Sequence, residues 1–224
     1  SATAAPSRIK AAFDEARAKA FAGKLIGALC SASLVLMNAI GHRTGLFEAL
    51  KRTSPCTSRE LAADANLAER YVREWLGAMV TGDIIQYRPE DGTYVLPSER
   101  AEFLTRKAVP SNMASMCQWI SVLAAVEDHV VDAFKHGQGI PYSAYKRFHH
   151  VMAEESAQTT VAGLLEHIVP LVPNLRDQLD AGIEVLDVGC GAGGAVNILA
   201  EYFPNSRFVG YDVCPEAIEL ARTE

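Results

Sequence analysis

Apolar residues recur at three- and four-residue intervals between about Arg8 and Leu50, for example at Ile9 and Phe13. This spacing is typical of helices that bury one face, so we predict a helical beginning of the chain. The stretch from Pro110 to His136 has the same period, with Ser111 as the expected N-cap of a helix. Its apolar face is expected to comprise Met113, Met116, Trp119, Ile120 and Leu123.

A capping-box pattern lies between these two stretches. Thr57 stands three residues before Glu60 at the head of an apolar pattern, which predicts a helix from Ser58 to about Asp64. A second helix, residues 68–80, should follow after a short turn and complete a helix-turn-helix pair. The face that it is expected to bury comprises Tyr71, Val72, Trp75, Leu76 and Met79.

Two short segments rich in β-branched and aromatic residues follow this pair. Residues 84–87 and 93–96 are expected to form strands, and residues 88–92, which contain a proline and an Asp-Gly pair, should form the hairpin loop between them. The order helix, turn, helix, hairpin is typical of a winged helix.

The apolar period changes abruptly after Gly182. The sequence predicts a strand at Ile183–Val188, a glycine loop, a helix at Gly194–Tyr202, a strand at Arg207–Tyr211 and a helix from Pro215. Strands that alternate with helices in this way predict a parallel α/β sheet.

The predicted fold class is therefore a mainly α, winged-helix N-terminal domain followed by the start of an α/β, Rossmann-like domain. We place a helical, winged-helix domain at residues 1–140, a helical connector at 141–182 and the first βαβα unit at 183–224. The region between Gly139 and Ser156 should contain the boundary. Only two strands precede the end of the chain, and the family resemblance given below implies a larger sheet, so the sheet is predicted to be truncated.

Composition narrows the possible partners. The chain has 224 residues, of which 49% are hydrophobic, and a formal net charge of −6, so bulk charge gives no attraction to nucleic acid or anionic lipid. The longest uninterrupted apolar runs are too short to span a bilayer, so no membrane is expected. The cysteines have no C-x-x-C pair, which argues against a zinc site or a disulfide framework and favours a cytoplasmic location. They are Cys30, Cys56, Cys117, Cys190 and Cys214.

The glycine loop carries the most specific chemical signal. Gly189, Gly191 and Gly194 satisfy the G-x-G-x-x-G pattern of dinucleotide-binding proteins, which alone is a weak indication. Asp187 stands two residues before the first glycine, where it would repel a pyrophosphate and attract a cationic group. Asp212 ends the second strand, where a carboxylate can accept hydrogen bonds from both hydroxyls of a ribose.

The segments Leu186–Gly193 and Val209–Asp212 resemble motif I and the second-strand acid of the class I S-adenosylmethionine-dependent methyltransferases. The resemblance implies S-adenosylmethionine as the cofactor, with its methionyl end at Gly189 and Gly191, its ribose at Asp212 and its adenine beside Val213. It further implies that Asp187 orients the loop or the amino group of the ligand. The cofactor-binding residues expected in this part of the chain are Asp187, Gly189, Cys190, Gly191, Gly193, Asp212 and Val213.

The segments Ile40–Phe47 and Pro141–Tyr145 are similar to a subgroup of these enzymes that has a winged helix before the methyltransferase domain. The resemblance implies a homodimer formed through the N-terminal domain, which also caps the pocket for a small-molecule substrate. It also implies that the helix after the tyrosines approaches the cofactor, which adds Tyr142, Phe148 and Met152 as candidate cofactor-binding residues, although aromatic and Met side chains at helical spacing are more often part of a core.

Two other functions stay open. A winged helix with a nucleotide-like domain is also compatible with a DNA-binding regulator, but acidic residues outnumber the arginines between Thr57 and Arg100. A non-catalytic dimerisation partner is the second alternative. The methylated atom and any catalytic residue are not assigned, His149, His150 and His167 are interpreted as packed or surface residues, and no metal is expected.

Overall fold

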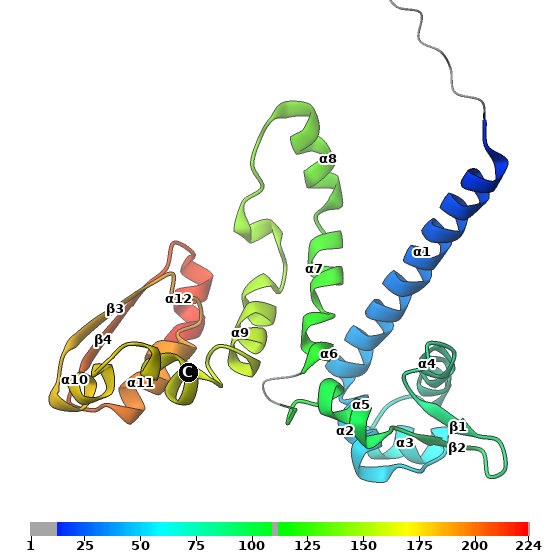
Figure 1. Cartoon of the computed structure of the whole chain (residues 1–224), viewed down its shortest axis with the longest axis horizontal. Helices are drawn as coiled ribbons and strands as arrows, with labels where there is room; N and C mark the ends of the chain where they lie inside the picture. Colours follow the sequence, from blue (N-terminus) through cyan, green and yellow to red (C-terminus); the bar gives the residue numbers. More distant parts are fainter. Residues whose placement is uncertain (1–12, 109–111, 224) are drawn as a thin grey trace, which may run out of the picture. The chain divides into compact units, whose positions relative to one another are not determined.

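The computed structural model describes residues 13–108 and 112–223 (Figure 1). The chain divides into two compact units between positions 33 and 34, within its first helix. The helices and strands of the N-terminal half are α1 (Glu15–Thr44), α2 (Leu46–Thr53), α3 (Ser58–Asp64), α4 (Glu69–Thr81), β1 (Gln86–Arg88), β2 (Thr93–Val95), α5 (Ser98–Leu104), α6 (Met113–Met116), α7 (Trp119–Ala124) and α8 (Glu127–His136).

The C-terminal half begins with short helical turns and ends in an α/β unit. Helix α9 and the turns around it occupy the predicted connector, and strands appear only after residue 183. The elements are a 3₁₀ turn at Tyr142–Ala144, α9 (Phe148–Gln158), a π turn at Leu164–Ile168, a 3₁₀ turn at Val169–Leu171, α10 (Leu175–Ala181), β3 (Glu184–Val188), α11 (Gly194–Tyr202), β4 (Arg207–Tyr211) and α12 (Pro215–Ala221).

Helix α1 is unusually long and apolar. It has 30 residues, and an 18-residue window within it reaches a mean hydropathy of 1.8, so by length and composition alone it is able to cross a membrane. Counting uninterrupted apolar runs missed this property because small and polar residues interrupt the pattern, and the expectation of no membrane-spanning segment is corrected to that extent. The large exposed side chains on the first part of the helix are Phe21, Leu25, Ile26 and Leu29.

The winged-helix core forms around Trp75. Its indole Nε1 donates a hydrogen bond to the carbonyl oxygen of Met37 at 2.9 Å, and its ring meets the Phe47 ring edge to face at 5.3 Å between centroids. Gly41 permits this packing, because a Cβ there would lie 2.5 Å from the indole. The largest fully buried side chains around it are Phe47, Leu50, Leu61, Leu76, Met79 and Ile85.

The predicted helix-turn-helix pair is confirmed, with one error in its buried face. Thr57 and Glu60 form both hydrogen bonds of the capping box, and α3 has the predicted bounds. Helix α4 buries Trp75 but leaves Tyr71 75% exposed, so the prediction that Tyr71 is buried is wrong. Tyr71 borders the apolar stripe, and its hydroxyl is better satisfied by water than by a core without a partner.

The wing is shorter than predicted. Strands β1 and β2 pair antiparallel, with Tyr87 opposite Tyr94, and the hairpin turns through Gly92 at φ +69°. Ile85 lies before β1 and does not extend the strand. Its side chain is 2% exposed and belongs to the core. A bridge between Cys56 and Tyr94 ties β2 to the chain before α3.

The single helix predicted over residues 110–136 is wrong in extent and in its buried face. Ser111 lies outside the described residues, and Asn112 caps α6, the first of three short helices. Met113 and Leu123 are exposed, whereas Gln118 is buried. Periodicity favoured the apolar stripe, but the polar side chains of the opposite face have buried hydrogen-bond partners that the local sequence does not reveal.

Strands β3 and β4 pair in parallel, with Asp187 opposite Gly210 and Val188 opposite Tyr211, as the alternation of strands and helices predicts. Helices α11 and α12 begin at the predicted residues. Within the helical connector predicted at 141–182, α9 ends at Gln158 and a π turn follows, so the connector is divided into short helical segments. A small core supports the unit and comprises Val169, Leu179 and Phe203.

Candidate functional site

The glycine loop after β3 has a backbone that only glycine adopts without strain. Gly189, Gly191 and Gly193 have φ angles of +88°, +55° and +81°. The backbone amides of Gly189 and Cys190 both donate to the carbonyl oxygen of Tyr211, at 2.7 and 3.0 Å. The loop is therefore fixed against the end of the neighbouring strand.

Asp212 fastens the other side of the same loop. Its Oδ2 accepts a hydrogen bond from the Gly191 amide at 2.9 Å, and its Oδ1 accepts one from the Cys214 amide at 2.9 Å. The sequence suggested a ribose-binding role alone. The structure adds a positioning role, because one carboxylate joins the glycine loop to the start of α12.

A cavity of about 250 Å³, here called the glycine-loop cavity, opens beside this loop. Asp187, Gly189 and Gly191 line it, together with Met152 of α9. The structure thus brings Met152 to the glycines from 37 or more positions away in the sequence, and Cys190 also lines this cavity.

A second cavity of about 650 Å³, here called the aromatic cavity, lies between the segment 142–150 and helix α12. Tyr142 and Phe148 line it, with ring centroids 5.3 Å apart in an edge-to-face contact. These two predicted cofactor residues are therefore not among the side chains that line the glycine-loop cavity. Gly193 caps α11, and Val213 is exposed outside both sets of lining residues.

His149 lines both cavities, so its interpretation from the sequence as an ordinary packed or surface residue is incomplete. Its Nε2 lies 2.9 Å from the Sγ of Cys214, which follows 65 positions later. Two adjacent histidines without a nearby carboxylate or Cys in the sequence match no site pattern, so only the fold reveals the contact between His149 and Cys214.

The charges around the glycine-loop cavity favour a cationic ligand. Asp187 is half-buried in its wall, and no Lys or Arg belongs to its lining among the residues that the structure describes. Burial, followed by the nearby carboxylates of Asp187 and Asp212, raises the pKa of the Cys190 thiol. Cys190 is therefore a protonated, weakly nucleophilic side chain at neutral pH.

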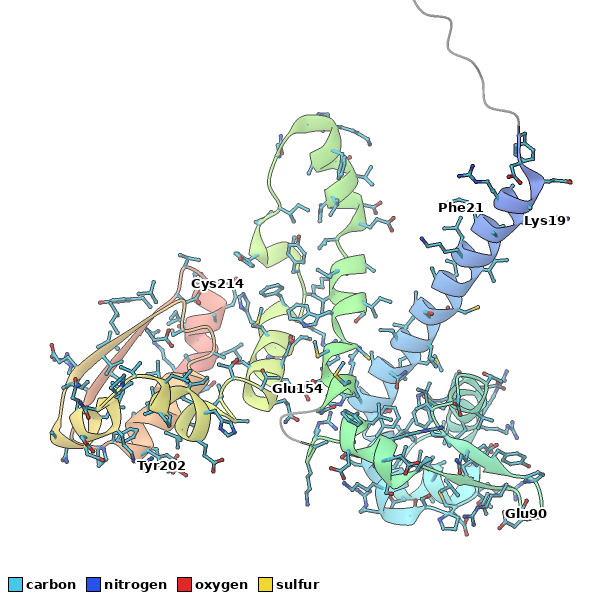
Figure 2. All side chains as sticks on the ribbon, viewed as in Figure 1. Lys19, Phe21, Glu90, Glu154, Tyr202 and Cys214 are labelled. Atoms are coloured by element: carbon cyan, nitrogen blue, oxygen red, sulfur yellow. The ribbon has the colours of Figure 1, made fainter. Side chains whose placement is uncertain are left out.

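A polar network behind α9 connects the cavity wall to the winged-helix segment. The carboxylate of Glu154 contacts His42 Nε2 and accepts a hydrogen bond from Gln118 Nε2, each at 2.7 Å (Figure 2 labels Glu154). The pKa of Glu154 is lowered to about 2, mainly by the hydrogen bond with His42. The hydrogen bond from Gln118 and the charge of Arg106 lower it further, whereas burial opposes the change. Arg147 adds a hydrogen bond from its Nη2 to Gln118 Oε1 at 2.6 Å.

This network determines which face of α9 meets the glycine loop. Met152 precedes Glu154 by two positions, so it points to another side of the helix. Anchoring Glu154 therefore helps to fix Met152 and His149 in the cavity walls.

The residues present fit the S-adenosylmethionine that the sequence implies. The Cβ positions of Gly189 and Gly191 point into open space, so the backbone there is accessible to a ligand. A carboxylate without a cationic partner in the cavity suits an ammonium or sulfonium group better than a pyrophosphate.

Two family models match the chain. The Rv2258c-like winged HTH domain matches residues 32–106, and a methyltransferase domain matches residues 179–224. The first match covers the winged helix described above, and the second begins just before β3.

Solved structures of methyltransferases have a similar fold. The human N-acetylserotonin methyltransferase in complex with SAM is 17% identical, with a TM-score of 0.57, and the alignment covers 96% of this chain and 64% of that one. The mitomycin 7-O-methyltransferase is 19% identical, with a TM-score of 0.60 and coverages of 94% and 63%. A putative O-methyltransferase from Nostoc punctiforme is 19% identical, with a TM-score of 0.58 and coverages of 91% and 59%. The chain thus spans about three fifths of the length of these structures.

Proposed function

Because the chain consists of a winged helix-turn-helix domain followed by part of a methyltransferase domain, we propose that it binds S-adenosylmethionine and forms part of an enzyme that methylates a small molecule. The observation that carries the proposal is the glycine-loop cavity. Its lining combines an acidic, glycine-rich loop with Met152 of α9 and includes no Lys or Arg among the residues described.

The residues divide the binding task between them. Asp187 would attract the cationic methionyl end, and the accessible backbone at Gly189 and Gly191 would receive it. Asp212 keeps the loop in shape through its two backbone contacts. It retains lone pairs that can accept hydrogen bonds from a ribose.

When bound, S-adenosylmethionine supplies an electrophilic methyl group. The role of the chain is then to orient donor and acceptor, which is the main source of rate acceleration in a displacement between two bound molecules. The aromatic cavity beside the loop is proposed as the space for the acceptor. Its lining combines the aromatic rings of Tyr142, Tyr145 and Phe148 with polar and charged side chains, so it offers a small molecule both apolar contact and hydrogen-bonding groups.

The cofactor proposal is tested by calorimetric titration with S-adenosylhomocysteine and, separately, NADH. We expect saturable binding of the first ligand only. Asp187→Asn should weaken it about tenfold, or about 1.4 kcal/mol, by removing the charge while keeping the shape. Asp177→Asn, an exposed change on α10, is the matched control and should leave affinity unchanged. Tighter binding of NADH, or no effect of Asp187→Asn, would contradict the proposal.

We propose that the winged helix serves assembly rather than DNA binding. Glu69 and Glu74 accompany Arg70 and Arg73 on α4, and Arg73 pairs with Glu69 at 3.7 Å. Such a helix has little net attraction for phosphates. A DNA-binding regulator would show strong, salt-sensitive binding to duplex DNA, which a filter-binding titration measures.

The exposed apolar side chains of α1 support a homodimer, and we propose a cytoplasmic location on the separate ground that the cysteines are free. Leu25 and Leu29 lie on this helix at an interval of four, and a second copy could cover them. Sedimentation velocity should give a dimer for the unaltered chain and a monomer for Leu25→Glu/Leu29→Glu, whereas the exposed control Lys24→Glu should remain dimeric. A monomer in the unaltered chain, or its co-sedimentation with neutral lipid vesicles, would refute this assignment.

A further inference from the structure

Three side chains beside the glycine loop form a chain of hydrogen bonds. Cys214 is buried just before α12 (Figure 2), and its Sγ lies 2.9 Å from His149 Nε2 and 2.9 Å from Glu216 Oε2. Among residues 13–108 and 112–223, no group of side chains has the arrangement of a metal site. The function of these three side chains, here called the trio, therefore depends on which of their atoms carry protons.

The proton positions follow from counting donors. Glu216 has a pKa below its ordinary value, first because the Cys214 thiol donates to it, so it is an ionised acceptor at neutral pH. The single proton of the thiol is thus used on the Glu216 side. The sulfur can meet His149 only as an acceptor, and His149 Nε2 must carry a hydrogen.

A neutral imidazole has one N–H group. If Nε2 holds that hydrogen, Nδ1 has a free lone pair and is a hydrogen-bond acceptor. The trio therefore selects one tautomer of His149, in the way that a partner on one ring nitrogen determines the protonation of the other.

The position of His149 makes this tautomer relevant to a ligand. Its side chain lines both the glycine-loop cavity and the aromatic cavity. Its ring lies 5.3 Å from that of Phe148 and 6.1 Å from that of Tyr142, so aromatic contacts hold it in place. It borders the spaces assigned above to the methyl donor and to the acceptor.

We propose that His149 is the proton acceptor of this site, and that Cys214 and Glu216 are positioning residues that hold it in the tautomer with an unprotonated Nδ1. The inference rests on the proposed methyltransferase function. Its substrates would be molecules whose methyl-accepting atom carries a hydrogen, namely alcohols, phenols or protonated amines.

The step balances without any further reactant. The accepting O or N atom forms a bond to the methyl carbon, while the bond from that carbon to the sulfonium sulfur breaks and its electron pair remains on sulfur. The hydrogen of the accepting atom moves as a proton to His149 Nδ1. The resulting imidazolium is stabilised through Cys214 by the negative charge of Glu216, and it loses its extra proton to solvent.

The tautomer is measured by long-range ¹H–¹⁵N NMR on the chain labelled with ¹⁵N-histidine, at a pH where the imidazole is neutral. We expect a single tautomer of His149, with the hydrogen on Nε2. Glu216→Gln should give a mixture, because an amide can also donate to the sulfur and no longer fixes the direction of the chain. His149→Gln identifies the His149 signals by their loss, whereas His150→Gln, at an exposed neighbour outside the trio, should leave the His149 signals unchanged. A hydrogen on His149 Nδ1, or the same single tautomer in Glu216→Gln, would overturn the proposal.

A pair of probes tests the acceptor role itself. Phenol offers a hydroxyl hydrogen, whereas anisole has a similar ring with that hydrogen replaced by methyl. Phenol should shift the His149 Nδ1 resonance and anisole should not, and an equal response to both would overturn the acceptor role.

Titration of the same sample with S-adenosylhomocysteine separates the two proposals. Failure of that ligand to bind, with the expected tautomer and phenol response, would remove the cofactor assignment and support the acceptor role of His149. Binding of that ligand together with a protonated Nδ1 would support the cofactor assignment and overturn the role of His149.

Discussion

Replacing Glu154 by Gln tests whether the network behind α9 depends on an ionised carboxylate. His42 and Gln118 each contact that carboxylate at 2.7 Å. Glutamine has nearly the same shape, but it has no charge and it presents an amide donor to two groups that donate to the carboxylate. The change therefore removes the electrostatic preference with little change in packing volume.

The magnitude follows from the pKa of Glu154, which is about 2 in the folded chain against an ordinary value of 4.5. At about 1.4 kcal/mol per pKa unit, this difference corresponds to about 3.5 kcal/mol as an upper figure. The Glu154 side chain is 30% exposed, so solvent screening reduces the expected contribution to about 1–2 kcal/mol.

The sign of the pH dependence is fixed by the direction of the pKa change. A carboxyl group with a lowered folded-state pKa stabilises the fold fully above its unfolded-state pKa, and the contribution disappears as the pH falls through the folded-state value. The free energy of unfolding of the unaltered chain should therefore exceed that of Glu154→Gln by a constant amount above about pH 6. The difference should shrink between about pH 4.5 and about pH 2.

Urea unfolding followed by tryptophan fluorescence, repeated across this pH range, measures the difference directly. Glu201→Gln, an exposed change on α11, controls for the loss of one negative charge. If the curves of free energy against pH for Glu154→Gln and the unaltered chain run parallel, the carboxylate charge is not what holds α9.

Two further substitutions test backbone and packing constraints. Gly193→Ala should lower the free energy of unfolding by about 1–2 kcal/mol because φ is +81° there, whereas Gly194→Ala, with only an ordinary contact at 3.6 Å, should be nearly neutral in the same urea experiment. Gly41→Ala should lower the melting temperature, with a cost of about 1–3 kcal/mol, because its Cβ would lie 2.5 Å from the Trp75 indole. Gly27→Ala, on an open face of the same helix, should instead stabilise by about 0.5–1 kcal/mol, and a loss of stability there would contradict this reasoning.

Local sequence patterns were sufficient to predict an element where a residue type at a given position has a single physical explanation. The capping box at Thr57 and Glu60 predicted the start of α3, because the two side chains satisfy backbone amides at a fixed spacing. The change from helical to strand period after Gly182 likewise predicted α11 and β4 to the residue. The glycine loop and Asp212 were found in the same way, and the structure brings them together.

Local signals failed where tertiary contacts decided the outcome. Gln118 is buried against the sequence pattern because Glu154 and Arg147 satisfy its amide. His149 was interpreted as an ordinary packed or surface residue because its partner, Cys214, is distant in the sequence. No periodicity or motif encodes such pairs, so only the folded arrangement of α9 against the α/β unit reveals them.

The hydrogen bonds from Gly191 and Cys214 to Asp212 also have a consequence for binding kinetics. Because folding itself sets the shape of the loop, a ligand meets a surface that does not have to be ordered first, and the entropic cost of ordering is not subtracted from its affinity. Encounter should then not be slowed by a conformational change of the loop. Differences in affinity among related ligands should therefore appear in how long each one stays bound.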